Sequence, residues 1–404
     1  MNAAQRELDL VLYGATGFVG KLTAQYLAGT GNGARIALAG RSPERLAIVR
    51  DSLGPSAKDW PLIAADATAP STLDTMAART RVVVTTVGPY SRYGLPLVAA
   101  CAAAGTDYAD LTGEATFVRE CIDLYHKQAA DNGARIVHSC GFDSIPSDVG
   151  VYALYRRVQA DGAGELGETT FVLRGISGGF SGGTIASGME VMRAASSDPQ
   201  VRRALNDPYT LSTDRVAEPD VGAQPDFAWR RGEKVAPELA GRWVGGFLMG
   251  PYNTRVVRRS NALQDWAYGR TFRYSEVMSL GSSQLAPWAS ATVTAAAAGL
   301  AAVGNRYFRL VPRRLVERVA PKPGSGPRET ARERGYYRVE TYTTTTTGAR
   351  YVATIAQRGD PGYKATSVLL GESGLGLALD RDRLSPLVGD LTPAAAMGDV
   401  LLSR

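Results

Sequence analysis

The chain has 404 residues, of which 45% are hydrophobic and 21% are charged, so it is long enough for two domains with a sizeable core each. This composition is typical of a soluble globular protein. The net charge of +6 and the pI near 9.2 would suit a nucleic-acid partner, but only six of the 45 basic residues are lysines and the arginines are scattered. We therefore expect no nucleic acid.

An apolar strand is predicted over Leu8–Tyr13, and the turn GATGFVG follows it. Its three glycines lie three residues apart before a helical pattern, which is the order strand, glycine turn, helix. A helix N-terminus presents free N–H groups and a positive dipole end to a pyrophosphate, and glycine lets the backbone approach it. The turn predicts a dinucleotide site, with a purely structural turn as the alternative. The expected cofactor contacts are Gly14, Thr16, Gly17, Phe18, Val19 and Gly20.

The second predicted strand, residues 35–39, ends in Gly40-Arg41-Ser42. An NAD-selective site usually places Asp or Glu here to hold the ribose hydroxyls. Arg41 instead suits a 2′-phosphate, because its guanidinium can donate charge-assisted hydrogen bonds to the phosphate oxygens. We therefore expect NADPH as the cofactor, with Arg41 and Ser42 at its phosphate. The alternative is that Arg41 is a solvated loop arginine.

Short apolar strands alternate with helical patterns up to about residue 140, which predicts βαβ units and a Rossmann-type, doubly wound parallel sheet over residues 1–150. Ligands of such α/β sheets lie at the carboxyl ends of the strands. Asp66, after the third strand, is expected either to accept a hydrogen bond from the adenine amine or to cap the next helix. Gly88 and Pro89, after the fourth strand, are expected beside the nicotinamide half of the cofactor.

Polar side chains also follow the fifth and sixth predicted strands, in residues 110–114 and 139–148. Helix capping and substrate contact explain these two loops equally well. The candidate catalytic residues at this edge of the sheet are Tyr90, Asp143 and Ser144. Tyr90 could donate a proton or hydrogen bond to the substrate, or it could pack against the cofactor or the core. Asp143 and Ser144 could orient the substrate or relay a proton.

From about residue 165 the βαβ rhythm ends, and residues 151–390 are predicted to form a second, α+β domain for substrate binding or oligomerisation. A strand over residues 168–176 leads through a glycine loop to a helix over residues 184–195. Residues 198–237, rich in Asp, Pro and Gly, are expected to be a long surface excursion.

An antiparallel hairpin is predicted over residues 336–347 and 350–357, with its turn at Gly348. It places an antiparallel sheet in the second domain. The tail, residues 391–404, has a helical pattern after Thr392-Pro393 and can pack back on the first domain.

Residues 277–305 contain no charged side chain, and alanine dominates their middle. Three interpretations are open: a buried or dimer-interface helix, a peripheral contact with lipid or an acidic carrier, and a transmembrane helix. Alanine gains little from transfer to lipid, and several Ser and Thr residues dilute the stretch further. The stretch could wall an apolar channel for an acyl chain. The arginines expected to meet an acidic carrier protein or phosphopantetheine are Arg306, Arg309, Arg313, Arg314 and Arg318.

Several motifs, taken in chain order, resemble those of the saccharopine dehydrogenase-like oxidoreductases. They are GATGFVG (14–20), AGR (39–41), VGPY (87–90), YADLTGE (108–114), GFDSIPSD (141–148), SGGT (181–184) and GSGPRETARERG (324–335). Within that family the chain is most similar to the actinobacterial trans-acting enoyl reductases, and LTPAAAMGD (391–399) resembles the C-terminal motif of that subgroup.

The resemblance implies that Gly14, Gly17, Gly20 and Arg41 bind the cofactor. It also implies reduction of a C=C bond in a carrier-bound polyketide or fatty acyl chain, for a polyketide synthase module that lacks its own reductase domain. The lipids made in this way are of the phthiocerol type. The resemblance supplies no catalytic residue, so the three candidates named above depend on position alone.

Two other functions stay open. One is an NADPH-dependent reductase of a C=N or C=O substrate, and the other is a non-catalytic NADP-binding protein at lipid surfaces. The chain has no Tyr-x-x-x-Lys pair, which argues against a short-chain dehydrogenase mechanism despite the similar glycine turn.

The numbers and spacing of cysteines and histidines indicate the redox state of the compartment and limit the metal sites that the chain can form. The cysteines are Cys101, Cys121 and Cys140, an odd number without a Cys-x-x-Cys pair, which favours free thiols in a reducing compartment. With two histidines in the chain, a histidine-based zinc site is not expected. Residues 1–7 are polar and no secretory signal is visible, so we expect a cytoplasmic protein, with membrane association and a homodimer as further expectations.

Overall fold

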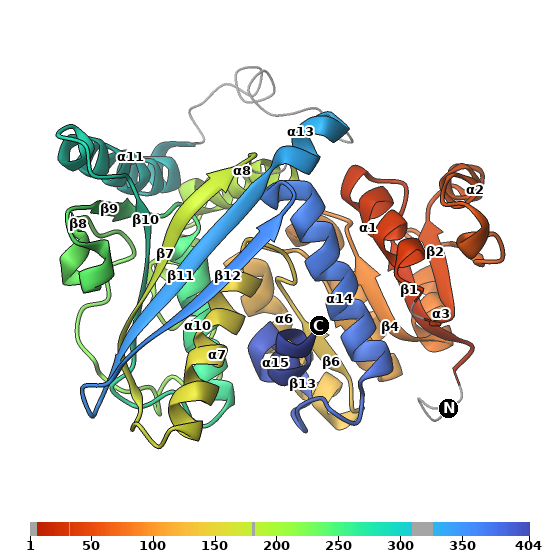
Figure 1. Cartoon of the computed structure of the whole chain (residues 1–404). Coiled ribbons are helices and arrows are strands. Elements are labelled where there is room, and N and C mark those ends of the chain that lie inside the picture. Colours follow the sequence, from red (N-terminus) through yellow and green to blue (C-terminus); the bar gives the residue numbers. More distant parts are fainter. Residues whose placement is uncertain (1–5, 32, 180–181, 309–325) are drawn as a thin grey trace.

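The computed structural model describes residues 6–31, 33–179, 182–308 and 326–404, and Figure 1 shows the arrangement of their helices and strands. Seven of the described strands form one parallel sheet in the order β13-β6-β5-β4-β1-β2-β3. These strands are β1 (Leu8–Tyr13), β2 (Ile36–Gly40), β3 (Leu62–Ala64), β4 (Thr80–Thr85), β5 (Asp107–Ala109), β6 (Arg135–Val137) and β13 (Gly389–Leu391). The predicted Rossmann-type sheet is confirmed.

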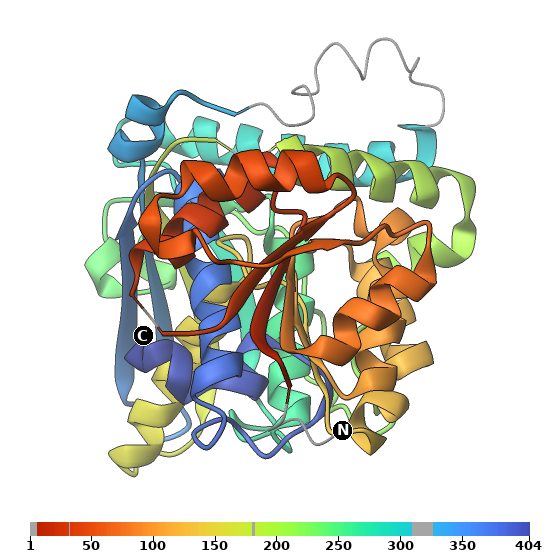
Figure 2. The ribbon, with the colours of Figure 1, turned by 90° about the vertical axis from the view of Figure 1, so that its right-hand side faces the viewer.

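Helices cover both faces of this sheet. Those of the first domain are α1 (Phe18–Gly29), α2 (Pro43–Ser52), α3 (Pro70–Arg79), α4 (Tyr90–Tyr93), α5 (Leu95–Ala104) and α6 (Ala115–Asp131). Helix α7 (Ile145–Ala160) begins at this sheet and then packs in the core of the second domain. Two more, α14 (Thr366–Leu379) and α15 (Pro393–Ser403), come from the end of the chain. Figure 2 shows these C-terminal helices, in blue, on one side of the sheet and the orange helices on the other.

Burial on both faces explains why the first strand reads as a continuous apolar run. All six residues of β1 are buried. Leu10 and Leu12 pack with α1 and α14, whereas Val11 and Tyr13 pack with α3, α5 and α6. Successive side chains of a strand point to opposite faces, so each face needs its own apolar set.

The end of the chain returns to the first sheet. Strand β13 pairs in parallel with β6, and Thr392 caps α15 by accepting a hydrogen bond from the Ala395 N–H. Helix α14 lies directly on β1 and β4, where a Cβ at Gly374 would come 2.5 Å from Val84 Cγ2 and 2.8 Å from Leu10 Cδ1. Glycine at this position therefore lets the helix approach the sheet closely.

Two glycine-to-alanine substitutions should consequently change stability in opposite directions. Gly374→Ala is expected to lower the free energy of unfolding by about 1–3 kcal/mol, because the new methyl overlaps branched core side chains. The same change at Gly188, an exposed helical position with no atom within 4 Å of a new Cβ, is expected to raise it by about 0.5–1 kcal/mol. Urea denaturation of both variants measures the difference. Equal shifts of the same sign would contradict the packing of α14.

A second, mixed sheet has the order β12-β11-β7-β10-β9-β8, and only β7 and β10 of its described strands pair in parallel. Its strands are β7 (Leu166–Ser177), β8 (Arg230–Arg231), β9 (Trp243–Gly246), β10 (Arg273–Ser279), β11 (Tyr336–Thr345) and β12 (Arg350–Arg358). The predicted hairpin is β11 and β12, and Gly348 has the positive φ of +83° that its turn requires. The predicted α+β second domain is confirmed.

The remaining α-helices among the described residues are α8 (Gly182–Ser197), α9 (Pro199–Asn206), α10 (Gly250–Leu263), α11 (Ala286–Tyr307) and α13 (Glu329–Arg334). Buried arginines of α10 fix the excursion after α9 to the core, because they donate to its backbone carbonyls. Arg258 donates to Pro208 O at 3.2 Å, and Arg259 donates to Leu211 O at 2.5 Å. The excursion is therefore attached by charge-assisted hydrogen bonds, and its buried Leu211 adds apolar packing against the core.

Helix α11 carries most of the uncharged stretch. Its Ser290 and Thr294 are buried against β9, where Ser290 donates to Val244 O at 2.7 Å and Thr294 Oγ1 accepts from the Gly246 N–H at 2.9 Å. Trp288 lies on the other side and is 74% exposed, next to the exposed Leu285. Within the described residues, no helix is both long enough and apolar enough to cross a bilayer.

Candidate functional site

The glycine turn has the geometry of a phosphate cradle. Gly14 has a φ of +89°, and a Cβ there would come 2.8 Å from Thr86 Oγ1. A Cβ at Gly20 would overlap the Gly14 carbonyl oxygen. Gly17 is exposed and is the N-cap of α1, with no side chain capping the helix. Glycine at positions 14 and 20 thus lets the turn fold tightly on itself, and the uncapped helix N-terminus is open to an anion such as a dinucleotide pyrophosphate.

The adenosine end of the site lies after β2 and β3. Arg41 is exposed directly after β2, and its positive charge reaches Asp66. The Ser42 hydroxyl accepts from the Arg45 N–H and so caps α2. Asp66 accepts from both the backbone and the hydroxyl of Thr68 at 2.9 Å, and these bonds, more than the charge of Arg41, lower the pKa of its carboxyl. Asp66 therefore closes a local turn, while the N-cap of the next helix is Ala69.

At the end of β4 the chain places an exposed Gly88, a half-buried Pro89 and a buried Tyr90. The Tyr90 hydroxyl donates to Thr85 O at 3.2 Å and accepts from the Leu111 N–H at 3.1 Å. Its ring packs on Phe117, and burial raises the pKa of its hydroxyl well above the usual value. These contacts favour the packing role for Tyr90 over the role of donor to the substrate.

The substitution Tyr90→Phe separates these two roles. It removes a hydroxyl bonded on both sides to backbone, so we expect the free energy of unfolding to fall by about 1 kcal/mol while turnover changes little. Tyr93→Phe is the matched control, because Tyr93 is the exposed end of the same helix and its loss should leave stability unchanged. A fall of a hundredfold or more in turnover by Tyr90→Phe, at unchanged stability, would instead support the donor role.

The buried carboxylate of Glu114 organises the edge of the sheet between β4 and β5. Its two oxygens accept from the N–H groups of Tyr90 and Ser91 at 2.9 Å each, which caps the N-terminus of α4. It also accepts from the Ser187 hydroxyl at 2.6 Å, and Ser187 belongs to α8. A second link to α8 is the ion pair between Arg92 and Glu190 at 2.7 Å. Helix α8 is therefore fixed beside the strand ends where the nicotinamide half is expected.

The two other candidates lie in the turn between β6 and α7. Asp143 is half-buried, whereas Ser144 is buried and donates to Asn253 Oδ1 of α10 at 2.9 Å. Asn253 in turn donates to Ser147 at 3.2 Å and to Glu276 at 3.0 Å. Burial raises the pKa of Glu276 to about 7. Ser144 thus belongs to a polar chain that joins the first domain to α10 and β10.

A charged cluster centred on His138 joins the last strands of the sheet. His138 Nδ1 lies 2.7 Å from Asp110 Oδ2, and its Nε2 lies 3.1 Å from Asp390 Oδ2 of β13. Arg259 of α10, 1% exposed, donates to the same Asp390 carboxylate at 3.2 Å. Burial lowers the pKa of His138, but the two carboxylates outweigh burial and raise it well above the usual value.

This raised pKa fixes the sign of a pH effect. Protonated His138 contributes stability below its unfolded pKa of about 6.5, and the contribution is lost as pH rises through the higher folded value. The difference in unfolding free energy between the wild type and His138→Gln should therefore shrink between about pH 6 and pH 9. Urea denaturation at both pH values tests this, and a difference that grows with pH would contradict the assigned charge.

The structure places the predicted cofactor residues along the carboxyl ends of β1, β2, β3 and β4, and places Asp143 and Ser144 after the end of β6. Sequence reasoning missed Glu114 as the cap of α4, and it missed α10 as the partner of Ser144. The sequence Thr112-Gly113-Glu114 is a recognisable polar turn after a strand. Only the fold, however, shows that the Glu114 carboxylate caps α4, a helix that comes earlier in the chain. Arg306 is exposed, whereas Arg309, Arg313, Arg314 and Arg318 lie outside the described residues.

Comparison with known proteins adds to this geometry. Residues 10–137 match the family described as the saccharopine dehydrogenase NADP binding domain. A trans-acting enoyl reductase of Mycobacterium ulcerans (strain Agy99) is 67% identical over 405 residues, covering 100% of this chain and 97% of the relative. One from Mycobacterium tuberculosis (strain ATCC 25618 / H37Rv) has the same identity and coverage.

A solved structure shares the fold over nearly the whole length. Apo saccharopine dehydrogenase (L-Glu forming) from Saccharomyces cerevisiae superimposes with a TM-score of 0.52 at 14% identity, covering 98% of this chain and 96% of that chain. Together with the glycine cradle, these matches define an NADP-dependent oxidoreductase of the saccharopine dehydrogenase type, and its cofactor is NADPH. The chain belongs to the family of the trans-acting enoyl reductases.

Proposed function

We propose that this protein reduces a C=C bond of an acyl chain held on the carrier protein of a polyketide synthase, with NADPH as the reductant. The observation that carries the proposal is identity of 67% over both domains to proteins named trans-acting enoyl reductase. Because the identity extends beyond the nucleotide-binding domain, it includes the second sheet and the helices that border the substrate side. We further propose a phthiocerol-type lipid as the product class, by the resemblance of the motifs.

Enoyl reduction needs a hydride at the β-carbon, stabilisation of the enolate oxygen and a proton at the α-carbon. Bound NADPH supplies the hydride. The chain supplies position: the glycine turn and α1 hold the phosphates, and the exposed Gly88 leaves room beside the end of β4. Helix α8, attached through Glu114 and Glu190, lies beside these strand ends and is our candidate for a wall of the substrate site. Asp143 stays our candidate for orienting the substrate.

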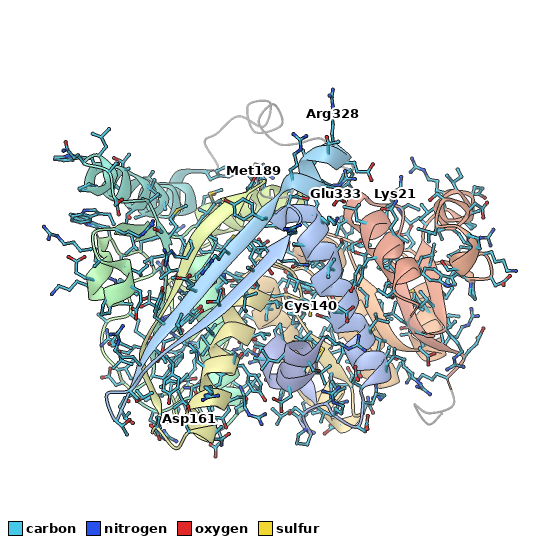
Figure 3. All side chains as sticks on the ribbon, in the orientation of Figure 1. Lys21, Cys140, Asp161, Met189, Arg328 and Glu333 are labelled. Carbon is cyan, nitrogen blue, oxygen red and sulfur yellow. The ribbon has the colours of Figure 1, made fainter. Side chains whose placement is uncertain are left out.

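The helices α8 and α11 pack on each other (Figure 1), and we propose that they border the path of a long acyl chain. Figure 3 places Met189 on α8 at this end of the molecule. On the outside of α11, the exposed Leu285 and Trp288 form an apolar surface. This surface supports a channel or a peripheral contact for an apolar chain, and the arginines after α11 are proposed to contact the acidic carrier. Reversal of Arg313 and Arg314 to glutamate should then slow turnover of carrier-bound substrate only.

The test is NADPH consumption with a long-chain 2-enoyl thioester on an acyl carrier protein, with the product followed by mass spectrometry. We expect a gain of two mass units on the acyl chain and a much lower rate with NADH. Turnover of a small polar imine or carbonyl compound, with the enoyl thioester ignored, would move the assignment to the alternative reductase. NADPH binding without any turnover, together with flotation on anionic vesicles, would support the non-catalytic alternative.

A further inference from the structure

The first residue of α1 is covered by a segment that lies more than three hundred residues later in the chain. The ring of Phe18 packs edge-on against Tyr363, with the ring centroids 5.0 Å apart. The guanidinium of Arg332 lies over the same ring, 5.3 Å from its centroid. A Cβ at Gly326 would overlap the Phe18 ring, so this backbone also touches it. Phe18 directly follows Gly17, so these contacts are made at the phosphate cradle itself.

The second domain fixes the position of the covering segment. The carbonyl of Arg332 accepts from the Asp360 N–H at 2.8 Å, and the carbonyl of Gly335 accepts from the Gly359 N–H at 2.8 Å. Glu333 forms an ion pair with Lys364. Helix α13 is thereby anchored to the loop after β12, and the side chain of Arg332 starts from a defined backbone position. In Figure 3, Arg328 extends outward from this helix, while Glu333 lies toward α14.

The charge of Arg332 is not neutralised by an ion pair at the cradle. Its guanidinium donates to the Pro327 carbonyl at 2.6 Å. Burial raises the pKa of the Asp360 carboxyl, and the charge of Arg332 acts to lower it. In the described part of the chain, however, no carboxylate oxygen lies within ion-pair distance of the Arg332 guanidinium. A guanidinium can contact an aromatic ring and still present N–H groups in a planar fork that matches phosphate oxygens. Here it lies beside a helix N-terminus whose dipole also favours an anion.

We propose that Arg332 binds the pyrophosphate of NADPH, so that the second domain completes the cofactor site of the first. The assignment to the pyrophosphate follows from position. The pyrophosphate lies at the N-terminus of α1, where Phe18 is, whereas the 2′-phosphate is expected at Arg41 after β2. The inference rests on the nucleotide site alone, and it holds whichever C=C, C=N or C=O bond the enzyme reduces.

The test compares NADPH with NADH, because the two differ only in the 2′-phosphate. Arg332→Ala should raise the dissociation constants of both nucleotides by about tenfold or more and by the same factor. Arg41→Ala should weaken NADPH and leave NADH unchanged. Arg334→Ala is the matched control, since Arg334 is an exposed arginine of the same helix, and it should leave both constants unchanged. Nicotinamide fluorescence titration of the full chain measures all of them.

Arg332→Met separates loss of charge from loss of packing, because it keeps an unbranched apolar stem over Phe18. Arg332→Met should weaken the binding of both nucleotides as much as Arg332→Ala does. The melting temperatures of both variants without nucleotide should equal that of the wild type. Dissociation constants within twofold of the wild type for both variants would overturn the proposal. So would a loss confined to NADPH, which would place Arg332 at the 2′-phosphate. Wild-type NADPH affinity without enoyl reduction would refute the proposed reaction and leave this test intact.

Discussion

Replacing Gly17 with valine is expected to weaken NADPH binding by about a hundredfold or more while the fold is retained. Gly17 is exposed, and the nearest atom to a new Cβ is the Gly14 carbonyl oxygen at 3.2 Å, so a side chain fits with a small local shift. The branched side chain would, however, occupy the space before α1 where the pyrophosphate must approach the N–H groups. The substitution therefore weakens NADPH binding and leaves the stability of the apoprotein unchanged.

Gly29→Val is the control for this prediction. Gly29 ends the same helix, is exposed and has no atom within 4 Å of a new Cβ, so both NADPH affinity and stability should change little. Fluorescence titration and thermal melting of the apoproteins give the two readouts. An unchanged dissociation constant for Gly17→Val would show that the dinucleotide does not lie at this helix N-terminus.

The second large effect is expected for Asp390→Asn, which should lower the free energy of unfolding by about 3–5 kcal/mol. The carboxylate of Asp390 is 1% exposed and faces both His138 and Arg259. The substitution keeps the shape of the side chain but leaves two buried cations with less compensating charge. Because His138 follows β6 and Arg259 lies on α10, the substitution is expected to destabilise both domains.

Asp399→Asn is the matched control, since Asp399 also forms an ion pair with an arginine, Arg156, but both side chains are about half exposed. Its effect should stay within about 1 kcal/mol. Urea denaturation of both variants measures the difference between a buried and an exposed carboxylate. Similar small shifts for the two variants would mean that the His138 cluster contributes no more than a surface pair.

Local sequence signals predicted individual elements of both domains well because they depend on neighbours along the chain. The strand Leu8–Tyr13, the glycine turn and the hairpin at Gly348 all lie where their residues predicted. Each follows from a rule of short range, either burial on both faces of a parallel strand or the positive φ that glycine tolerates. The cofactor prediction was equally local, because one turn and one arginine carry it.

The candidate catalytic residues were harder to predict, since their roles depend on contacts across the fold. Tyr90 and Ser144 stand at the expected strand ends, but the structure engages their hydroxyls with the backbone of Leu111 and with Asn253. A sequence pattern gives the position of a side chain along a strand, and the packing of distant elements decides whether its polar atom is free for a substrate.

The sequence by itself determined a Rossmann-type NADPH site and a second domain with an antiparallel hairpin, because period, turns and glycine spacing are local properties. Only the tertiary structure decided that β13 and α14 complete the first sheet, that Glu114 holds α8, and that Arg332 reaches Phe18. The Glu114–Ser187 bond joins residues 73 positions apart and the Phe18–Arg332 contact joins residues 314 positions apart, and no local pattern encodes such pairs. They form because a buried charge needs a partner and an apolar face needs to be covered, and the residues that do so can come from any part of the chain.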